Sequence, residues 1–576
     1  MSTPIVRPVW RPPVEDPPPA VVRALAAELK LPEPLCRLLV ARGHSTPGAA
    51  KSFLRPSLDA LHDPALLTDL PRAVTRLEAA LDAGETIFVH GDYDVDGMCA
   101  AALYTRVLRR LGADVVPFVP HRVRDGYDLG PSGVRRAREA GAGLILTGDC
   151  GVVAHDAVAA AAEVGIDVVV TDHHTPGATL PDAVAVVNPK RDDCVYPNPH
   201  LSGTGVAYKL ALALARSRGV PEEEIHYTLD LVALATVADV MPLDGENRIL
   251  TRYGLRVLDR SRNPGLGALR SAAGLADREL TAGLLSHVMA PRLNAVGRLG
   301  DAAVGLRLLL AEDGDAAGIA RELESVNARR QAVDREILGQ ALDALDGYDP
   351  ATDRGVVLAG EGWHPGVIGI VASRVVERIH RPTVLIAVPD GNGPARGSAR
   401  SIPGFDLLDA IRACGEHLER FGGHKAAAGF DIEVDRIDAF TRAFAEAARE
   451  RLPEAPVPEQ RIDMELRMAE ITPELVRYLG YAAPFGMGNP TPVFALRGVG
   501  AEGVRGVGSD GSHLKLQLTE GEVGIPAIGF RMTASHGEIA RSGGPLDAAV
   551  KLEEDRWKGR RRIQAKLVDL KPSRAG

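Results

Sequence analysis

Three short segments of the chain concentrate side chains that bind divalent metal ions. The segment VHGDYDVDGM (89–98) is followed by TGDCG (147–151) and TDHH (171–174). Their candidate ligands are His90, Asp92, Asp94, Asp96, Asp149, His173 and His174. Two ions about 3.5 to 4 Å apart can hold the attacking and leaving oxygens of a phosphoester displacement. Mixed histidine and carboxylate ligands in this number therefore predict metal-dependent phosphoester hydrolysis.

Each of these segments follows an apolar, β-rich run. Such runs recur at 86–90, 113–120, 143–149, 166–172 and 183–189, and helical stretches separate them. This alternation predicts a mostly parallel sheet with helices on both faces. Sheets of this kind bind ligands just beyond the carboxyl ends of their strands. We therefore expect the three segments to meet at one edge of the sheet.

Simpler explanations exist for each segment alone. DYDVDG (92–97) resembles a calcium loop, but Leu103 stands where that loop needs a glutamate. One aspartate could instead cap the next helix, so we assign Asp92 either a metal-binding or a structural role. His173 and His174 alone could be structural histidines. The coincidence of three strand ends favours a metal site.

Rival chemistries lack their sequence motifs. The chain contains no GxxxxGK[ST], HExxH or GxSxG motif, and GTGVAY (203–208) breaks the dinucleotide-binding pattern. Its five cysteines are scattered and form no CxxC pair, which argues against a zinc-thiolate site and a disulfide framework. Metal-dependent hydrolysis is left without a competitor.

Length and composition indicate a multidomain globular protein. A chain of 576 residues suggests about three domains. No apolar run approaches the roughly 20 residues of a membrane span, and the first twenty residues, with seven prolines, do not resemble a secretory signal. We expect a cytoplasmic protein with no membrane partner. The net charge of −9 does not exclude a nucleic-acid partner, because a local basic track can coexist with an acidic surface.

The pattern along the chain predicts five segments. Residues 1–30 are expected to form a flexible proline-rich lead-in, 31–313 the α/β domain with the parallel sheet, and 314–348 a long connecting helix. Residues 349–453 are expected to form a smaller α/β domain, and 454–576 a small β-barrel of the OB-fold type. The long helix could instead be an ordinary surface helix of the first domain.

Nine motifs together resemble the DHH phosphoesterase family. They are HGDYDVDG, TGDCG, DHH, ATVADVMPL (235–243), PRLNAVGRL (291–299), GWHPGVIGIVASR (362–374), GSARS (397–401), GGHKAAAGF (422–430) and PFGMGNPTPVF (484–494). Within this family the chain is similar, over roughly residues 30 to 570, to the bacterial single-strand-specific 5′→3′ DNA exonucleases. The resemblance identifies the three folded parts as a DHH domain, a DHHA1 domain and an OB-fold.

The resemblance also implies a ligand set. One ion would be held by His90, Asp94 and Asp149, and the other by Asp96, Asp149, His173 and Asp239. His174 would lie beside the scissile phosphate. Histidine among the ligands favours Mn²⁺, with Mg²⁺ as the second possibility.

The resemblance further implies the substrate contacts. Phosphate or DNA contacts would come from Arg122, Arg298, Ser398, Arg400 and His424, and barrel contacts from Trp557, Arg560, Arg561 and Arg562 in RWKGRRR (556–562). That stretch could also be a solvated charged hairpin.

The implied function is removal of mononucleotides from the 5′ end of single-stranded DNA, in recombination and repair. A single-strand-binding protein and a RecQ-type helicase would be the protein partners. The alternatives are a DHH phosphodiesterase of very short oligonucleotides and a non-catalytic single-strand-binding relative. The second alternative predicts broken metal ligands, whereas every expected ligand is present.

Overall fold

The computed structural model describes residues 7–12, 15–122, 124–391, 393–557 and 560–573, and describes no side chains between 555 and 561. The chain forms two compact units. One contains Thr46–Ala328 with Leu479–Thr491, and the other contains Met1–Ser45, Arg329–Tyr478 and Pro492–Gly576. Within the described residues, no helix combines the length and apolarity that a bilayer crossing requires.

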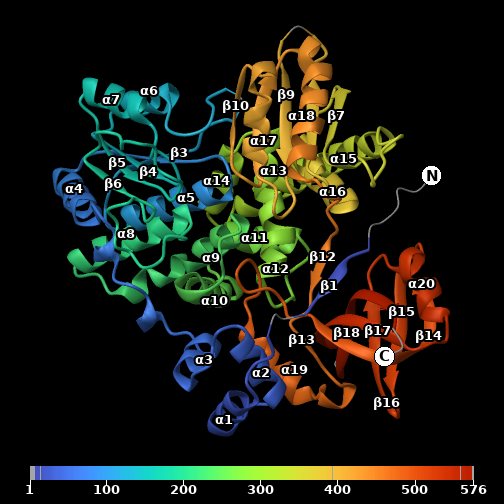
Figure 1. The fold of residues 1–576 in the computed structure, drawn as a ribbon. Helices are drawn as coiled ribbons and strands as arrows, with labels where there is room; N and C mark the ends of the chain where they lie inside the picture. Colours follow the sequence, from blue (N-terminus) through green and yellow to red (C-terminus); the bar gives the residue numbers. More distant parts are fainter. Residues whose placement is uncertain (1–6, 13–14, 123, 392, 558–559, 574–576) are drawn as a thin grey trace. The chain divides into compact units, whose positions relative to one another are not determined.

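The first unit contains the predicted parallel sheet (Figure 1). Its order is β3-β2-β4-β5-β6, and every neighbouring pair is parallel. The strands are β2 (Ile87–Gly91), β3 (Val115–Phe118), β4 (Leu144–Gly148), β5 (Asp167–Thr171) and β6 (Ala185–Val187). The expected α/β architecture is confirmed.

Helices bury both faces of this sheet. Ile87 and Val89 pack into one core with α4 (Leu70–Ala83), α5 (Val95–Arg110) and α8 (Gly203–Ser217). Phe88, which points the opposite way, packs into a second core with α6 (Pro131–Glu139) and α7 (His155–Glu163). Strands covered on both sides read as continuous apolar runs, which is why the sequence revealed them.

A helical layer completes this unit. It consists of α3 (Pro47–Leu54), α9 (Leu229–Ala238), α10 (Gly245–Asp259), α11 (Pro264–Ala272), α12 (Ala282–Leu284), α13 (Ala290–Leu299) and α14 (Ala303–Leu309). Residues Leu229 to Val237 of α9 are all buried, as expected for a helix that is apolar all round. The 28-residue helix α15 (Ala316–Asp343) occupies the segment expected to connect two domains.

The smaller α/β domain has a mixed sheet in the order β10-β11-β9-β8-β7. In the described part of this sheet, β7 and β8 pair in parallel, and the other neighbouring strands pair antiparallel. Its elements are β7 (Val356–Glu361), α16 (Ile368–Ile379), β8 (Thr383–Val388), β9 (Ala395–Arg400), α17 (Leu407–Ala413), β10 (Arg420–Gly423), β11 (Ala427–Ile432) and α18 (Ile437–Arg451).

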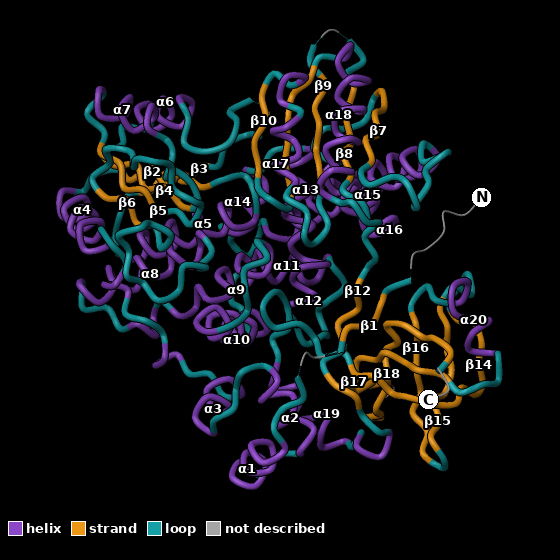
Figure 2. The backbone as a smooth tube through the Cα atoms, viewed as in Figure 1, coloured by secondary structure: helices purple, strands orange, loops and turns teal. Residues whose placement is uncertain are grey.

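The last domain is the expected β-barrel, whose strands are orange, like all other strands, in Figure 2. Its strands pair in the order β13-β14-β15-β16-β18-β17, and β14 pairs with β17 to close the barrel. The elements are β13 (Met464–Glu465), α19 (Pro473–Leu479), β14 (Phe494–Val507), β15 (His513–Glu520), β16 (Val523–Gly529), α20 (Thr533–Arg541), β17 (Leu546–Trp557) and β18 (Arg560–Pro572).

The N-terminal segment contributes secondary structure of its own. Within the stretch expected to be a flexible lead-in, β1 (Val9–Arg11) pairs in parallel with β12 (Glu459–Arg461). The Trp10 indole donates a hydrogen bond of 2.6 Å to Asp569 in the barrel. Helices α1 (Pro19–Leu29) and α2 (Glu33–Ala41) follow.

Candidate metal centre

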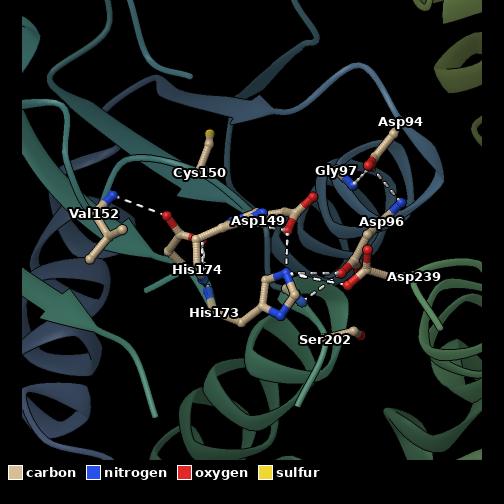
Figure 3. Close-up of polar contacts among 12 residues, drawn as sticks. Asp94, Asp96, Gly97, Asp149, Cys150, Val152, His173, His174, Ser202 and Asp239 are labelled. Carbon is tan, nitrogen blue, oxygen red and sulfur yellow. Dashed lines mark hydrogen bonds and ion pairs between the residues drawn. The ribbon is translucent and has the colours of Figure 1, made fainter. Parts of the chain in front are cut away.

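Asp149 lies at the centre of a cluster of acidic and imidazole groups beyond β4 (Figure 3). Its φ of 69° is in the left-handed region, which aspartate tolerates better than most residues. Its backbone N–H donates to the carbonyl of Thr171, at the end of the neighbouring strand β5. This hydrogen bond joins the ends of β4 and β5 at the place where the candidate ligands follow the two strands.

His173 brings the carboxylates together. Its Nε2 lies 3.1 Å from Asp149, 3.5 Å from Asp239 and 3.8 Å from Asp96. Burial lowers the pKa of His173 to about 4, so the ring is neutral at pH 7 and offers a lone pair. A neutral histidine surrounded by carboxylates matches the donor set of a divalent-metal site.

Among the residues that the structure describes, ligand atoms within 4.8 Å of one another form three groups. They are Asp149 with His173 and His174, Asp96 with His173 and Asp239, and Asp92 with Asp94 and Asp149. Asp149 and His173 each belong to two groups. The structure therefore brings together seven of the eight predicted metal and catalytic residues, including Asp92, whose role the sequence left open.

The helix that follows the first segment positions two of these aspartates. Asp94 caps α5, and its carboxylate accepts hydrogen bonds from the N–H groups of Asp96 and Gly97. The carboxylate of Asp96 accepts hydrogen bonds of 2.7 Å from the N–H groups of Gly203 and Thr204, at the start of α8. These contacts fix the carboxylates before any ion binds.

Gly203 also allows α8 to approach Asp149 closely. A Cβ atom on Gly203 would lie 2.4 Å from Cβ of Asp149, far inside van der Waals contact. No larger residue fits there unless Asp149 moves. The glycine is therefore part of the support of the metal centre.

The site concentrates negative charge away from water. Burial, followed by the neighbouring aspartates, raises the pKa of Asp94, of Asp149 and of Asp239, the last to about 8. Oδ1 of Asp149 and Nε2 of His173 make no hydrogen bond in the described structure although they lie 3.1 Å apart. Buried polar atoms without partners are costly. Bound divalent cations would neutralise the carboxylates, and Oδ1 of Asp149 and Nε2 of His173 would coordinate them.

His174 differs from its neighbour. Its Nδ1 lies 2.8 Å from Oδ1 of Asp172, which also accepts the N–H groups of His173 and His174. Burial alone would lower the pKa of His174, but the bond to Asp172 outweighs it and raises the pKa to about 9. His174 is therefore cationic at neutral pH and 38% exposed, as suits a group that contacts an anionic substrate.

His90 is the predicted ligand outside these groups. It is buried at the end of β2, with Nδ1 3.6 Å from Sγ of Cys150. Its Nε2 makes no hydrogen bond to a described residue and faces Gly133, where an added Cβ would lie 2.8 Å away. Burial lowers its pKa to about 4. Its assignment to the first ion stays a prediction.

Two predicted phosphate-binding arginines, Arg122 and Arg298, act electrostatically on Tyr93, which stands between the candidate ligands Asp92 and Asp94 in the sequence. The guanidinium of Arg122 is 4.9 Å from the centre of the Tyr93 ring. Burial raises the pKa of Tyr93 to about 12, and the charges of Arg122 and Arg298 oppose that rise. On the helix of Arg298, Asn294 accepts the Val95 N–H at 3.2 Å. This helix therefore positions the metal-binding loop as well as an arginine.

The remaining predicted phosphate contacts lie in the smaller α/β domain. Arg400 donates to Oγ of Ser398 at 3.2 Å on strand β9. Both side chains face Gly369 in the first turn of α16, where an added Cβ would lie 2.7 Å from Arg400. His424 lies in the turn between β10 and β11, and its N–H donates to the carbonyl of Ala427, which pairs with Arg400. The three residues therefore gather at one end of this sheet.

At the barrel tip, the side chains of Trp557, Arg560 and Arg561 lie outside the described part of the structure. The backbone pairs Trp557 with Arg560 across β17 and β18, and Arg562 is exposed. The predicted contacts of all four residues stay predictions.

Sequence reasoning missed Asp128 and the role of Asp172. Asp128 has a φ of 74°, and its carboxylate accepts the Gly151 N–H at 2.6 Å, which supports the turn after Asp149. It follows no strand, so no pattern marked it. Asp172 opens the DHH triplet, and its place before two histidines was the available signal.

Comparison with known families agrees with the expected resemblance. The chain matches the DHH family N-terminal domain over residues 86–236, the DHHA1 domain over 352–450 and the RecJ OB domain over 462–569. The single-stranded-DNA-specific exonuclease RecJ of Bacillus subtilis is 34% identical over 95% of this chain and 69% of its own length. RecJ of Escherichia coli is 40% identical over 74% of this chain and 78% of its own length.

Solved structures extend the likeness to the fold, and two of them contain metal ions. The crystal structure of RecJ from Thermus thermophilus with Mn²⁺ has a TM-score of 0.83 at 34% identity, and covers 98% of this chain and 80% of that protein. The same protein with Mg²⁺ gives a TM-score of 0.79 at 32% identity, with coverage of 98% and 79%. The homologue therefore binds both metals that the sequence predicted.

Proposed function

The chain belongs to the RecJ family of single-stranded-DNA-specific exonucleases, which are metal-dependent DHH phosphoesterases, and on this basis we propose that it removes mononucleotides from the 5′ end of single-stranded DNA with two divalent ions. The observation that carries the proposal is the position of Asp149. It belongs both to the group with Asp92 and Asp94 and to the group with His173 and His174, as a carboxylate shared by two ions would.

The proposed ligand sets follow the sequence expectation with one addition. Asp94, Asp149 and His90 would hold one ion, and Asp92 would join this set because its ligand atoms group with those of Asp94 and Asp149. Asp96, Asp149, His173 and Asp239 would hold the other. When bound, the ions activate water and offset the charge that develops on the reacting phosphate. We propose Mn²⁺ as the preferred ion, because histidine contributes to the site.

The protein's own side chains bind and orient the substrate. Cationic His174, held by Asp172, donates a hydrogen bond to a non-bridging oxygen of the scissile phosphate. The exposed guanidinium of Arg122, which rests on the Tyr93 ring, pairs with a neighbouring or terminal phosphate. In the smaller α/β domain, Ser398, Arg400 and His424 offer a second set of phosphate donors.

The direction of digestion, the role in recombination and repair, the cytoplasmic location and the assistance of a single-strand-binding protein and a RecQ-type helicase are part of this proposal. They rest on the family relationship. The intact ligand set supports an enzyme over a non-catalytic relative, and the barrel supports a long single strand over very short oligonucleotides.

End-labelled substrates test the proposal. Single strands labelled at the 5′ or the 3′ end are incubated with Mn²⁺ and either the intact protein or Asp149→Ala. We expect early release of the 5′ label by the intact protein and none by the variant. Asp182→Ala, which removes an exposed aspartate outside the cluster, serves as control. Early release of the 3′ label would refute the polarity, and an active Asp149→Ala would refute the site.

A further inference from the structure

The segment Leu479–Thr491 belongs to the unit that contains the metal cluster, although the residues before and after it belong to the other unit. It includes most of the motif PFGMGNPTPVF (484–494), to which the proposed function assigns no role. Within the segment, Gly486 and Asn489 form a backbone bridge. The buried amide of Asn489 also donates to two carbonyls of the same segment, at 2.9 and 2.8 Å. Residues 481–489 therefore form a compact loop, here called the clasp.

Two arginines fasten the clasp to helix α10. Arg248 is 2% exposed, and its guanidinium donates to the four consecutive carbonyls of residues 481–484 at 2.8 to 3.5 Å. Arg252, one turn further along the helix, donates to two of the same carbonyls at 2.9 Å. A buried guanidinium needs several acceptors in place of water, and the clasp supplies four to Arg248. The clasp is therefore held firmly beside the start of α10.

The tip of the clasp contacts the loop between α9 and α10. The Leu243 N–H in this loop donates to the carbonyl of Met487 at 2.7 Å. On one side of Met487, a Cβ atom added to Gly486 would lie 2.7 Å from Cδ1 of Leu243. On the other side, a Cβ atom added to Gly488 would lie 3.1 Å from Cβ of Pro242. The two glycines therefore let the clasp lie directly against the loop.

The same loop contains a strained residue next to a proposed metal ligand. Val240 directly follows Asp239, and its φ of 58° lies in the left-handed region. The Met241 N–H donates to the carbonyl of Thr236 at 3.0 Å, which closes α9 by a motif that usually has glycine at the left-handed position. A β-branched residue is unfavourable there and persists only where surrounding contacts hold the backbone.

The side chain of Val240 does not provide that support, since the residue is 54% exposed. The backbone is held instead by α9 on one side and by the clasp on the other. If Val240 left this conformation, the hydrogen bonds that close α9 would break and its last turn would fray. Asp239 caps that turn, and its Oδ2 lies 3.5 Å from Nε2 of His173 (Figure 3). The position of this carboxylate therefore depends on the loop.

We propose that the clasp is a positioning element of the metal centre, which holds the loop after α9 in its strained conformation and so keeps Asp239 beside His173 as a metal ligand. This inference rests on the two-ion centre of the proposed function. It gives a role to the motif PFGMGNPTPVF (484–494), whose contacts act on the ion through Asp239.

Mn²⁺ binding to the full chain tests the proposal, with titration calorimetry and with electron paramagnetic resonance of the free ion. In Gly486→Ala/Gly488→Ala, the clasp variant, the new methyl groups press on the loop. We expect one of two ions to bind about 10- to 100-fold more weakly and the other to bind as in wild type, the pattern also expected for Asp239→Asn. Gly480→Ala/Gly498→Ala is the matched control. Gly498, like Gly488, has a positive φ, but Cβ atoms at the two control positions would meet nothing within 4 Å in the described structure.

A third substitution separates positioning from general destabilisation. Glycine adopts the left-handed conformation at no steric cost. Adding Val240→Gly to the clasp variant should therefore restore the affinity of the weakened ion to within about threefold of wild type. A general loss of stability would show no such recovery. Thermal melting in EDTA confirms that the variants fold, and Gly488→Ala alone, compared with Gly498→Ala, replaces the clasp variant if that protein does not fold.

Two results would overturn the proposal. One is wild-type affinity for both ions in the clasp variant, and the other is equal weakening of both ions. Failure of Val240→Gly to restore binding would contradict the part assigned to strain. A wild-type protein that binds fewer than two ions would refute the two-ion centre itself, which is distinguishable from a loss confined to the clasp variant.

Discussion

Oδ1 of Asp149 lies 3.1 Å from Nε2 of His173, and the two residues follow the ends of adjacent parallel strands. The atoms are close without forming a hydrogen bond in the described structure. A carboxylate and a neutral imidazole that point at a common region are what two ligands of one divalent ion require. This pair is the geometric core of the proposed two-ion centre.

Enlarging Gly203 should disturb that pair. In Gly203→Ala the new Cβ would lie 2.4 Å from Cβ of Asp149, so Asp149 must shift. We expect Mn²⁺ affinity, measured by titration calorimetry, to fall about 10- to 100-fold, the usual cost of disturbing the support of a ligand. Gly267→Ala is the matched control, because its Cβ would meet nothing within 4 Å. Wild-type affinity in Gly203→Ala would contradict the account.

Metal-free protein should lose stability as pH rises from about 7 to 8. Burial raises the pKa of Asp239 to about 8, and the bond to Asp172 raises that of His174 to about 9. In this range the folded protein binds more protons than the unfolded chain, so the free energy of unfolding falls with pH. His173, with a pKa of about 4, is neutral in the folded protein throughout this range, and the residual protonation of this histidine in the unfolded chain near pH 7 opposes the fall only weakly.

Thermal melts at the two pH values, with EDTA or with saturating Mn²⁺, check this expectation. Mn²⁺ should raise the melting temperature and abolish its decrease between the two pH values, because bound ions keep the carboxyl groups deprotonated. In EDTA, the melting temperature of Asp239→Asn should decrease less between the two pH values than that of wild type. Equal stability of the chelated wild-type protein at both pH values would count against the charge distribution described above.

Arg122 should contribute to the use of phosphorylated ends. Loss of a charge-assisted hydrogen bond to phosphate corresponds to about a 10- to 100-fold drop in kcat/KM. We expect Arg122→Ala to show this drop on 5′-phosphorylated single strands. Arg124→Ala is the control, because that arginine is exposed in the same loop and lies 3.7 Å from Asp301. Equal losses of kcat/KM in the two variants would show that Arg122 acts only as a general surface charge.

The hairpin tip of the barrel gives a separate prediction. Replacing Arg560, Arg561 and Arg562 with glutamine should weaken single-strand binding and reduce its salt dependence, since each contact contributes about 0.7 to the slope. Fluorescence anisotropy in EDTA measures both. A slope equal to that of wild type would show that the tip does not contact the DNA.

The sequence predicted the site where a simple rule connects pattern to position. Apolar runs that end in Asp or His marked strand ends, and parallel strands bring those ends together, so Asp149 and His173 could be placed side by side. Asp239 follows no strand but ends the buried helix α9, and only the family resemblance pointed to it.

Features that depend on contacts between distant segments could not be predicted. Gly486 and Leu243 are far apart along the chain, and nothing in their local sequence relates them. They meet only because the segment Leu479–Thr491 returns to the unit that contains the metal cluster. Asp128 was missed for a similar reason, since its contact with Gly151 depends on a loop conformation with positive φ.

The most direct test of the two-ion centre is anomalous scattering from a crystal grown with Mn²⁺. We predict two anomalous peaks that share Asp149 as a ligand, one on the side of Asp92 and Asp94, and the other on the side of His173 and Asp239. The absence of peaks at this cluster, or a single peak that Asp149 does not contact, would contradict the account.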